Sequence, residues 1–416
     1  MQINETDFDV LVIGGGAAGM MAAGVASSLG KKVILLEKNS RLGEKLKISG
    51  GGRCNITNAQ FENRAHLESY GKAEKFLYSP FSEFGVKEAF SFFESLNLPL
   101  VVQARNRAFP HTERAIDVVN ALKGFLDKNR VIIKTNCTVK EILKKDNKVV
   151  GVLTNQEEFR AKSYILSTGG VSHPETGSTG DGFKWLKDLE HTVKQPTPSI
   201  VPLAVSDVWV KMLSGRSLSF MKITFFLDGK KQFSKIGKVL FTHFGLSGPL
   251  ILNSATDVGD LLQEGEVKAY IDTYPDTDLG ALDQHIVNIF NKNKNKTLRT
   301  VFKEIVPAGC SFALQTLFPQ INFDTKVHSV SREERKSMVN YLKALPVTIT
   351  HLMGYDRAVI ADGGVALEEI DTKTMRSKLF ENLYIIGDLL HINRPSGGFS
   401  LQLCWTTGYI AGNSAA

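Results

Sequence analysis

Three glycines near the N-terminus have the spacing of a dinucleotide-binding loop. Gly14, Gly16 and Gly19 match the pattern G-x-G-x-x-G and directly follow an apolar run. In such a loop the first glycine makes a tight turn, the second lets the backbone approach a diphosphate, and the third lets helix and strand pack closely. Free N–H groups at the start of the following helix bind the anion. The pattern therefore predicts a dinucleotide diphosphate at this loop and at the adjoining Ala17 and Ala18.

An acidic residue stands where the ribose of this dinucleotide is expected. Glu37 ends the apolar run 32–37, about 20 residues beyond the glycine pattern, as in dinucleotide-binding folds. A carboxylate at this place accepts hydrogen bonds from the adenosine ribose. Because an isolated glycine pattern is a weak signal, this spacing is what makes the prediction strong.

The elements that must position these residues are a strand, a helix and a second strand. The runs 8–13 and 32–37 are apolar without alternation, which indicates strands buried on both faces of a parallel sheet. Further buried strands are predicted at 164–167 and 383–388, and short β-branched runs within 130–170 predict a small antiparallel meander. The predicted fold class is therefore α/β, a Rossmann-like parallel sheet with a β-meander.

Three features favour FAD as the dinucleotide. The glycine pattern lies at the N-terminus of a long chain, a predicted strand precedes 168–170 in the middle, and a C-terminal strand ends in Gly387-Asp388 before a glycine-led helix. This arrangement resembles the two-dinucleotide-binding-domain flavoproteins, in which a terminal Gly-Asp places a carboxylate on the ribityl or pyrophosphate region. The sequence contains no second G-x-G-x-x-G. A reduced nicotinamide would therefore dock without a fingerprint of its own.

The order of elements predicts that this FAD domain is interrupted. Pro196, Pro198 and Pro202 form a stiff extended crossing, typical of a domain boundary. Strand and hairpin signals follow it, then helical ones, and after about residue 352 the chain again reads like the first domain. The predicted parts are 1–195 (FAD-binding domain, first part), 196–277 (inserted β-rich domain), 278–350 (inserted helical subdomain) and 351–416 (FAD-binding domain, second part).

Six motifs occur in the order typical of one flavoprotein family. They are 50–58 (GGGRCNITN), 107–110 (RAFP), 175–182 (ETGSTGDG), 201–203 (VPL), 241–249 (FTHFGLSGP) and 397–402 (GGFSLQ). Together they resemble the bacterial BaiN-type flavoproteins, which are also described as aminoacetone oxidase family FAD-binding proteins or NAD(P)/FAD-dependent oxidoreductases. The resemblance covers nearly the whole chain. It implies an FAD domain split by a β-barrel-like piece and a small helical piece, and 179–182 also resembles fumarate reductase relatives.

The motifs and the resemblance together assign the FAD contacts. In the loop 50–58, glycines permit close backbone approach, Arg53 and Asn55 offer directional donors, and Cys54 is assigned contact without chemistry because no second cysteine is near it. No residue is clearly placed for a covalent bond, so the FAD is expected to be non-covalent. The predicted contacts are Gly14, Gly16, Ala17, Ala18, Gly19, Glu37, Lys38, Lys45, Gly51, Gly52, Arg53, Cys54, Asn55, Val139, Thr168, Gly169, Gly170, Gly387, Asp388, Gly397, Gly398, Phe399 and Leu401.

Histidines are the candidate proton donors. His243 follows an apolar strand and precedes Gly245-x-x-Gly248-Pro249, so we expect it to reach from the inserted domain toward the flavin. A structural role explains His243 equally well. His173 is a second catalytic candidate and His391 a third, and both depart from residues common in the family. We therefore carry over no substrate from any member.

The composition limits the ligands, the disulfide or metal sites and the cellular location to be expected. The 416 residues include 50 Lys+Arg and 43 Asp+Glu, a net charge of +7 that suits anionic small ligands as well as polyanions. The four cysteines are scattered without C-x-x-C spacing, which supports neither a disulfide framework nor a metal site. The weakly polar run 10–26 contains five glycines after an acidic start, unlike a signal peptide or a membrane span. We expect a cytoplasmic protein with no metal, no membrane association and no nucleic-acid partner.

The predicted function is that of an FAD-dependent oxidoreductase acting on a small molecule. NAD(P)H, docking transiently, would reduce the flavin, and an organic acceptor such as an activated C=C bond would reoxidise it. One alternative is an oxidase of a small amine or alcohol that uses O2. Another is a non-enzymatic FAD-containing binding or regulatory protein, with Lys292, Lys294 and Lys296 as a polyanion contact. The oligomeric state stays open.

Overall fold

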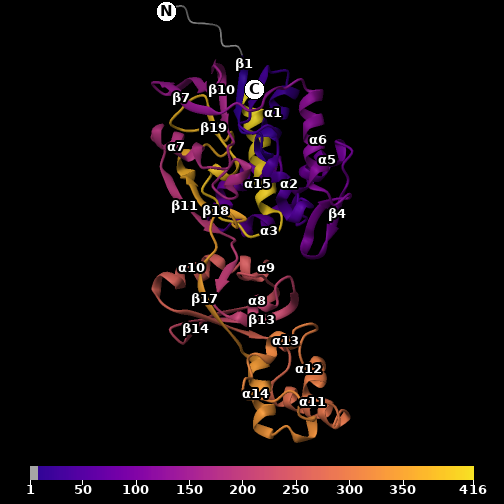
Figure 1. Ribbon diagram of the computed structural model, residues 1–416. Helices are drawn as coiled ribbons and strands as arrows, with labels where there is room; N and C mark the ends of the chain where they lie inside the picture. Colours follow the sequence, from indigo (N-terminus) through magenta and orange to yellow (C-terminus); the bar gives the residue numbers. More distant parts are fainter. Residues whose placement is uncertain (1–7) are drawn as a thin grey trace, which may run out of the picture. The chain divides into compact units, whose positions relative to one another are not determined.

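The chain folds into two compact units. The computed structural model describes residues 8–416 (Figure 1). Unit 1 comprises the chain up to Pro198 together with Ala358–Ala416, and unit 2 comprises Ser199–Arg357. The chain passes from one unit to the other after Pro198 and after Arg357, a few residues beyond the predicted boundaries at 195/196 and 350/351.

A five-stranded parallel sheet forms the centre of unit 1. Its order is β19 (Leu383–Ile385), β10 (Ala161–Leu166), β1 (Phe8–Ile13), β2 (Val33–Leu36) and β6 (Ile132–Lys134), and every neighbouring pair is parallel. The apolar residues of β1 and β2 are buried, as their lack of alternation predicts. The predicted Rossmann-like α/β fold is thereby confirmed. In contrast to its predicted place near the meander, β6 is an edge strand of this sheet.

The register of the sheet brings four separate segments to one edge. Ile13 lies beside Leu36 and Leu166, and Leu166 lies beside Ile385. Because the strands are parallel, the residues that follow each of them emerge at the same carboxyl edge, where ligands of such sheets bind. This edge therefore gathers the glycine loop, Glu37, the segment after β10 and the segment after β19.

Two helices with small residues cover the sheet at this edge. The helix α1 (Ala17–Ser28) packs on α15 (Phe399–Ala415). A Cβ on Gly408 would lie 2.6 Å from the carbonyl oxygen of Ala18, and one on Gly412 would lie 2.5 Å from that of Ala22. Only glycine permits so close an approach of the two backbones. The contact places the second half of α15, far along the sequence, beside α1.

Three smaller sheets complete unit 1. The predicted meander is β7 (Val139–Lys145), β8 (Lys148–Thr154) and β9 (Glu158–Phe159), all antiparallel. A second antiparallel sheet has the order β3 (Thr57–Asn58), β5 (Arg107–Pro110) and β4 (Leu100–Gln103). A two-stranded sheet joins β11 (Val193–Ser199) to β18 (Ile360–Val365). The helices of unit 1 besides α1 and α15 are α2 (Glu44–Gly52), α3 (Asn63–Leu67), α4 (Glu74–Glu83), α5 (Val86–Ser95), α6 (Ala115–Lys128) and α7 (Asp181–Asp188).

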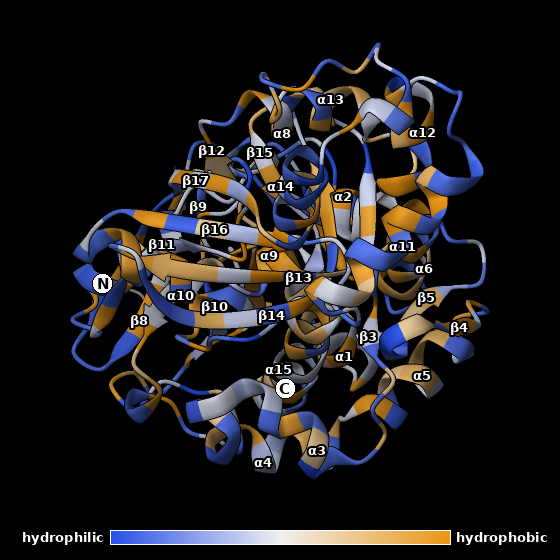
Figure 2. Ribbon diagram, turned by 90° about the horizontal axis from the view of Figure 1, so that it is seen from below, coloured by the Kyte–Doolittle hydropathy of each residue, from blue (hydrophilic) through white to orange (hydrophobic). Residues whose placement is uncertain are grey.

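Unit 2 contains a closed six-stranded barrel, as the β-barrel-like insertion predicts. Its order is β12 (Leu203–Val205), β15 (Gly245–Ser247), β14 (Lys230–Phe241), β13 (Ser217–Leu227), β16 (Val267–Asp272) and β17 (Leu345–Leu352). Asp228 and Gly229 form the predicted hairpin turn between β13 and β14. Apolar residues dominate β13, whereas β14 mixes apolar and polar residues (Figure 2). Residues 345–350, placed in the predicted helical stretch, are instead barrel strand and close the sheet against β12.

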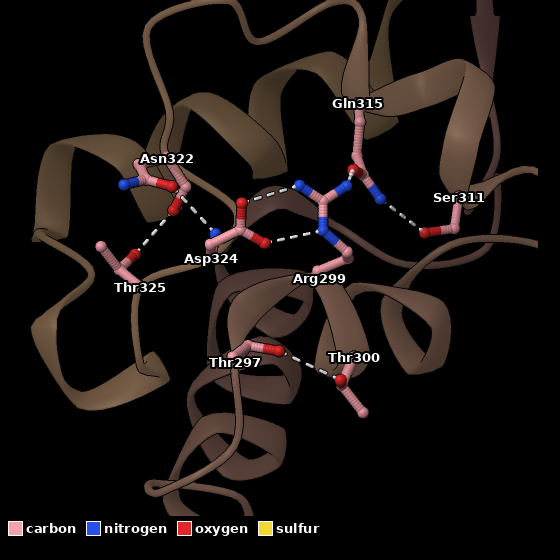
Figure 3. Close-up of polar contacts among 8 residues, drawn as sticks. All are labelled: Thr297, Arg299, Thr300, Ser311, Gln315, Asn322, Asp324 and Thr325. Atoms are coloured by element: carbon pink, nitrogen blue, oxygen red, sulfur yellow. Dashed lines mark hydrogen bonds and ion pairs between the residues drawn. The ribbon is translucent and has the colours of Figure 1, made fainter.

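The short helices α8 (Val208–Met212), α9 (Pro249–Leu252) and α10 (Ala255–Glu264) accompany the barrel. A helical part lies in the chain between the barrel strands β16 and β17, with α11 (Leu279–Lys292), α12 (Leu298–Ile305), α13 (Ser311–Gln315) and α14 (Arg332–Lys343). Polar contacts tie its connections together (Figure 3). Arg299 donates from Nε and Nη2 to Asp324 at 2.8 and 3.1 Å and from Nη1 to Gln315 at 2.8 Å. Ser331 and Glu334 form a capping box at the start of α14. Within residues 8–416, no helix combines the length and the apolar character needed to span a bilayer.

Candidate functional site

The glycine loop has the geometry that its spacing predicts. A Cβ on Gly14 (φ 105°) would lie 2.7 Å from the carbonyl oxygen of Ser167, and one on Gly19 would lie 1.9 Å from that of Gly14. A Cβ on Gly16, by contrast, would meet no atom within 4 Å. At Gly14 and Gly19, neighbouring protein atoms therefore leave no room for a side chain. Gly16 leaves open space beside the loop, where the diphosphate is predicted to lie.

The N-terminus of α1 faces this open space with unused donors. No side chain within residues 8–416 caps the helix, which begins at Ala17 after an extended Gly16. The first N–H groups of a helix have no intrahelical acceptor, and the helix dipole adds partial positive charge there. The loop and helix therefore supply both shape and donors for an anion.

Glu37 follows β2 at the carboxyl edge and is almost fully buried. Its Oε2 accepts the N–H of Gly15 at 2.7 Å and its Oε1 accepts the N–H of Asn39 at 2.8 Å. Burial raises the pKa of the carboxyl group, and the two backbone hydrogen bonds oppose this effect. Each carboxylate oxygen keeps a second lone pair, so Glu37 can accept further hydrogen bonds from hydroxyl groups.

We expect Glu37→Ala to weaken FAD binding about ten- to a hundred-fold, because a hydrogen bond to a charged group contributes roughly 1.5–3 kcal/mol. Turnover of the remaining holoenzyme should change less, since the ribose is remote from the reacting ring. Fluorescence titration of apoprotein with FAD after dialysis measures the affinity. Glu37→Gln is the matched control, because it keeps one oxygen for the N–H of Gly15 or Asn39. Unchanged affinity in Glu37→Ala would remove this residue from the site.

The loop 50–58 interrupts α2 with backbone that only glycine adopts easily. Gly51 and Gly52 have φ of 68° and 83°, and a Cβ on either would meet nothing within 4 Å. The side-chain oxygen of Asn55 is buried and makes no hydrogen bond in the part of the chain that the structure describes. Cys54 is buried beside it, and burial raises the pKa of its thiol to about 12. The thiol is therefore protonated at neutral pH, which disfavours nucleophilic or redox chemistry.

Two further groups near the carboxyl edge lack the partners that burial demands. The hydroxyl of Thr168, directly after β10, is buried and makes no hydrogen bond within residues 8–416. Lys45 donates to the hydroxyl of Ser172 at 3.2 Å but forms no ion pair with a described residue. Burial lowers its pKa, and Asp388 is the main opposing charge. The ammonium group of Lys45 and the hydroxyl of Thr168 can therefore donate hydrogen bonds to the oxygens of a bound anionic cofactor.

The carboxylate of Asp388 is already engaged by a residue that the sequence analysis did not single out. It forms an ion pair with Arg394, which is 4% exposed. Arg394 also donates to the carbonyl oxygen of Ile392 at 2.6 Å and to the hydroxyl of Ser400 at 3.1 Å. The assignment of Asp388 to FAD stays a prediction, and the contact would use the lone pairs that Arg394 leaves free.

The start of α15 is anchored on β3. A Cβ on Gly398 (φ 105°) would lie 2.2 Å from the carbonyl carbon of Thr57, and Asn58 donates from Nδ2 to the carbonyl oxygen of Gly397 at 3.3 Å. No described side chain caps this helix either. The N–H groups of its first turn therefore remain available to stabilise negative charge.

Phe399 packs into an aromatic cluster instead of lining open space with its ring. The ring lies 4.8 Å from that of His66, and its carbonyl oxygen accepts the hydroxyl of Tyr70 at 2.9 Å. His66 is fully buried, and burial lowers its pKa to about 4. The predicted cofactor contact of Phe399 would therefore come from its backbone N–H.

The remaining predicted contacts lie in varied surroundings. Lys38 forms an ion pair with Asp181 at 2.9 Å, which links the end of β2 to the motif 175–182. Val139 is buried at the start of β7, and Leu401 is half-buried against the core. Gly387 (φ 65°) donates its N–H to the hydroxyl of Thr407, and Gly169 and Gly170 follow Thr168. Contact of these residues with FAD stays a prediction.

The two catalytic candidates belong to different units. His173 lies in unit 1, with φ of 52° and its Nδ1 2.9 Å from Oε1 of Glu175. His243 lies in unit 2, is exposed, and has its ring 4.9 Å from that of Phe244. The predicted FAD contacts all belong to unit 1. The catalytic role of either histidine stays a prediction.

The residues of unit 1 fit FAD. Among the described residues, Gly16 faces open space, α1 has no side-chain cap, Lys45 has no ion pair, and the buried oxygens of Asn55 and Thr168 make no hydrogen bond, so each leaves a place for a group that a dinucleotide would supply. All of them lie in unit 1, on segments that end at or pack near the carboxyl edge of one parallel sheet. No group of three or more metal-ligating side chains occurs in the described chain.

We expect the purified protein to be yellow and to release its FAD on acid precipitation. The site offers hydrogen bonds and charge, while the thiol of Cys54 is held protonated by burial and so is poorly suited to a covalent bond. Absorbance and chromatography of the supernatant check this result. Colour retained in the pellet, or FMN in place of FAD, would contradict it.

A Rossmann-type sheet with a glycine loop, a buried carboxylate at the end of its second strand and an inserted barrel is the arrangement of FAD-binding flavoproteins. The chain belongs to the family of the HI0933-like protein Rossmann domain, which matches residues 8–414. This confirms the resemblance to BaiN-type proteins, whose members are FAD-dependent oxidoreductases.

Two relatives align over nearly the whole chain. The 3-dehydro-bile acid delta(4,6)-reductase of Clostridium scindens is 28% identical over 408 residues, 97% of this chain and 98% of the relative. The ribosomal RNA dihydrouridine synthase of Haemophilus influenzae is 28% identical over 405 residues, 96% of each chain. Among solved structures, the open conformation of a flavocytochrome c3 fumarate reductase has a TM-score of 0.52 and 17% identity and covers 99% of this chain and 78% of that one. The structural likeness shows a shared fold.

Proposed function

We propose that the chain is an FAD-dependent reductase in which NAD(P)H reduces the flavin and a C=C bond conjugated with a carbonyl group reoxidises it. One observation carries the proposal: two relatives that match nearly end to end are named for reactions of this kind. A 3-dehydro-bile acid with delta(4,6) unsaturation contains a conjugated ketone, and dihydrouridine is uridine whose conjugated C=C bond is saturated. The bound flavin would supply hydride transfer.

Reduction of a conjugated C=C bond sets two tasks for the side chains of this protein. Hydride addition leaves an enolate, so a donor must stabilise the carbonyl oxygen and an acid must protonate the neighbouring carbon. The uncapped N-terminus of α15 supports the proposal, because its N–H groups stabilise negative charge close to the predicted flavin site. His243 is the proposed acid, as the resemblance of 241–249 suggests.

His391 is a weaker candidate for this acid. Its Nε2 lies 3.2 Å from Nζ of Lys194 and 3.5 Å from Oδ1 of Asp362. Burial and the charge of Lys194 lower its pKa, against the opposing effect of Asp362. Because a general acid works best with a pKa near the operating pH, a histidine that loses its proton early is poorly suited to this task. We keep His173 as the second candidate.

The class of acceptor is the finer part of the proposal. From the sequence we expect a small molecule and no nucleic acid, whereas the name of the relative from Haemophilus influenzae adds an RNA base as a candidate. Anaerobic assays of NADPH consumption with a steroid dienone, with fumarate and with a uridine-containing ribosomal RNA fragment discriminate these classes. Consumption with the dienone alone supports a small-molecule reductase. Consumption with the RNA alone would overturn the small-molecule expectation.

The reductive half-reaction is tested separately. Anaerobic mixing of the holoenzyme with NADPH or NADH should bleach the visible absorbance of the flavin. Bleaching by a small amine, with no response to either nicotinamide, would instead favour the oxidase. No response to any of them would favour a binding or regulatory role.

A further inference from the structure

Arginines gather at one end of the small sheet β3-β5-β4 in unit 1. Arg107 begins β5 and lies directly opposite Gln103 of β4. Arg53 has its Nη1 3.3 Å from Oε1 of Gln103 and its Cζ 4.4 Å from the ring centroid of Phe109. Because Phe109 stands two residues beyond Arg107, the two share a face of the sheet. Arg53 therefore lies over the face on which Arg107 is presented.

A third arginine joins them from a strained turn. Arg105 and Asn106, directly before β5, have φ of 64° and 55°, a left-handed conformation that residues with a Cβ rarely adopt. The carbonyl oxygen of Arg105 accepts a hydrogen bond from Nδ2 of Asn58 at 3.3 Å. We call Arg53, Arg105 and Arg107 the arginine cluster.

The charge of the arginine cluster is not balanced inside the protein. Glu113 pairs with Arg53 at 3.3 Å, but neither Arg105 nor Arg107 forms an ion pair within residues 8–416. Burial and then the like charges of Arg105 and Arg53 lower the pKa of Arg107. Three positive charges thus face one negative charge, and a bound anion would offset both the burial and the repulsion.

The arginine cluster is connected to the flavin end of the predicted site. Asn58 lies opposite Arg107 in the pairing of β3 with β5, a distance of about 5 Å between strands. The same Asn58 side chain donates a hydrogen bond to the carbonyl oxygen of Gly397, which directly precedes Gly398, the N-cap residue of α15. Arg53 follows the open backbone of Gly51 and Gly52 in the sequence. A ligand held by the cluster would therefore lie beside the start of α15.

We propose that the arginine cluster binds the phosphate groups of the nicotinamide dinucleotide that reduces the flavin, with Arg105 and Arg107 as the main donors because Arg53 is also a predicted FAD contact. The inference rests on the proposed function. The single glycine fingerprint serves FAD, so NAD(P)H needs another source of phosphate contacts in the chain. Guanidinium groups supply them, because each presents a fork of N–H donors that matches two phosphate oxygens.

Equilibrium binding of NADP+ to oxidised holoenzyme tests the proposal without any turnover. Arg107→Gln should raise the Kd about ten- to a hundred-fold, the effect of losing a charge-assisted hydrogen bond. Arg105→Asn should act in the same direction, and asparagine tolerates the left-handed backbone there. Arg107→Lys should fall between, since it keeps the charge without the fork. The matched control is Arg160→Gln, which removes an exposed arginine paired with Glu158 elsewhere in unit 1 and should leave the Kd unchanged.

The salt dependence of the Kd for NADP+ and a competing RNA oligonucleotide distinguish the results that support the proposal from those that overturn it. The Kd of the parent should rise with ionic strength more steeply than that of Arg107→Gln, because the variant has lost a phosphate contact. Equal Kd values for parent, Arg107→Gln and Arg105→Asn would overturn the proposal, as would failure of the parent to bind NADP+. The proposal would also be overturned if these variants bound a uridine oligoribonucleotide more weakly than the parent but bound NADP+ equally well. NADP+ binding that depends on Arg107, in an enzyme whose flavin NADPH does not reduce, would uphold the cluster as a dinucleotide phosphate site and reject the proposed function.

Discussion

His243→Ala is expected to slow reoxidation of the reduced flavin by the organic acceptor by about 10²–10⁴-fold, the usual contribution of a positioned general acid. Reduction of the flavin by the nicotinamide should proceed at the rate of the parent, because that step needs no proton on the acceptor. Stopped-flow measurement of each half-reaction separates the two effects. The prediction rests on the motif 241–249 and on the exposure of His243.

The competing explanation, a structural histidine, has a different signature. It predicts a lower melting temperature and two nearly normal half-reactions in the folded fraction. His285→Ala is the matched control, because it removes another exposed histidine from unit 2. Equal reoxidation rates in His243→Ala and the parent would remove His243 from the catalytic candidates and leave His173 to be tested.

Two glycine substitutions in the G-x-G-x-x-G pattern are expected to differ in their effects on apoprotein stability and on FAD affinity. Gly16→Ala places a Cβ where the described chain has no atom within 4 Å, so the apoprotein should melt at or slightly above the temperature of the parent. FAD binding should weaken on the order of a hundred-fold, because the methyl group occupies space that the diphosphate needs, at about 3 kcal/mol. Fluorescence titration with FAD and apoprotein melting curves measure both quantities.

Gly19→Ala should destabilise the apoprotein itself. Its Cβ would lie 1.9 Å from the carbonyl oxygen of Gly14 and 2.5 Å from the hydroxyl of Ser167, and such overpacking costs about 3 kcal/mol. Melting temperature and FAD affinity should therefore fall together. If Gly16→Ala bound FAD as tightly as the parent, the diphosphate could not lie at this loop. If Gly19→Ala melted normally, the close contact of α1 with Gly14 and Ser167 would be refuted.

The sequence predicts the parallel sheet and its glycine loop well because these depend on local rules. An apolar run without alternation needs burial on both faces, and a tight turn from β1 into α1 needs glycine at fixed positions. The role of Gly408 and Gly412 at the α1 contact has no comparable pattern, because it depends on which helix lies opposite.

Closure of the barrel is hard to predict from the sequence because it depends on which distant strand lies opposite. The strand β17 follows the helical part and pairs with β12, far earlier in the chain, and Pro346 favours reading the segment as a helix terminator rather than a strand. The ion pair of Arg394 with Asp388 and the arginine cluster likewise arise where separate segments converge. Buried polar atoms that have no hydrogen-bond partner among residues 8–416, such as those of Asn55 and Thr168, can be recognised only once burial is known.

We propose that electrons pass from a reduced nicotinamide, through FAD, to a conjugated C=C bond. Anaerobic double mixing tests it most directly: the holoenzyme is first mixed with NADPH and then with a conjugated ketone or a uridine-containing RNA fragment. We expect the visible flavin absorbance to be lost in the first step and to return in the second, with one saturated product formed per flavin reoxidised. Absorbance that returns only when O2 is admitted, after bleaching by an amine rather than by NADPH, would contradict it.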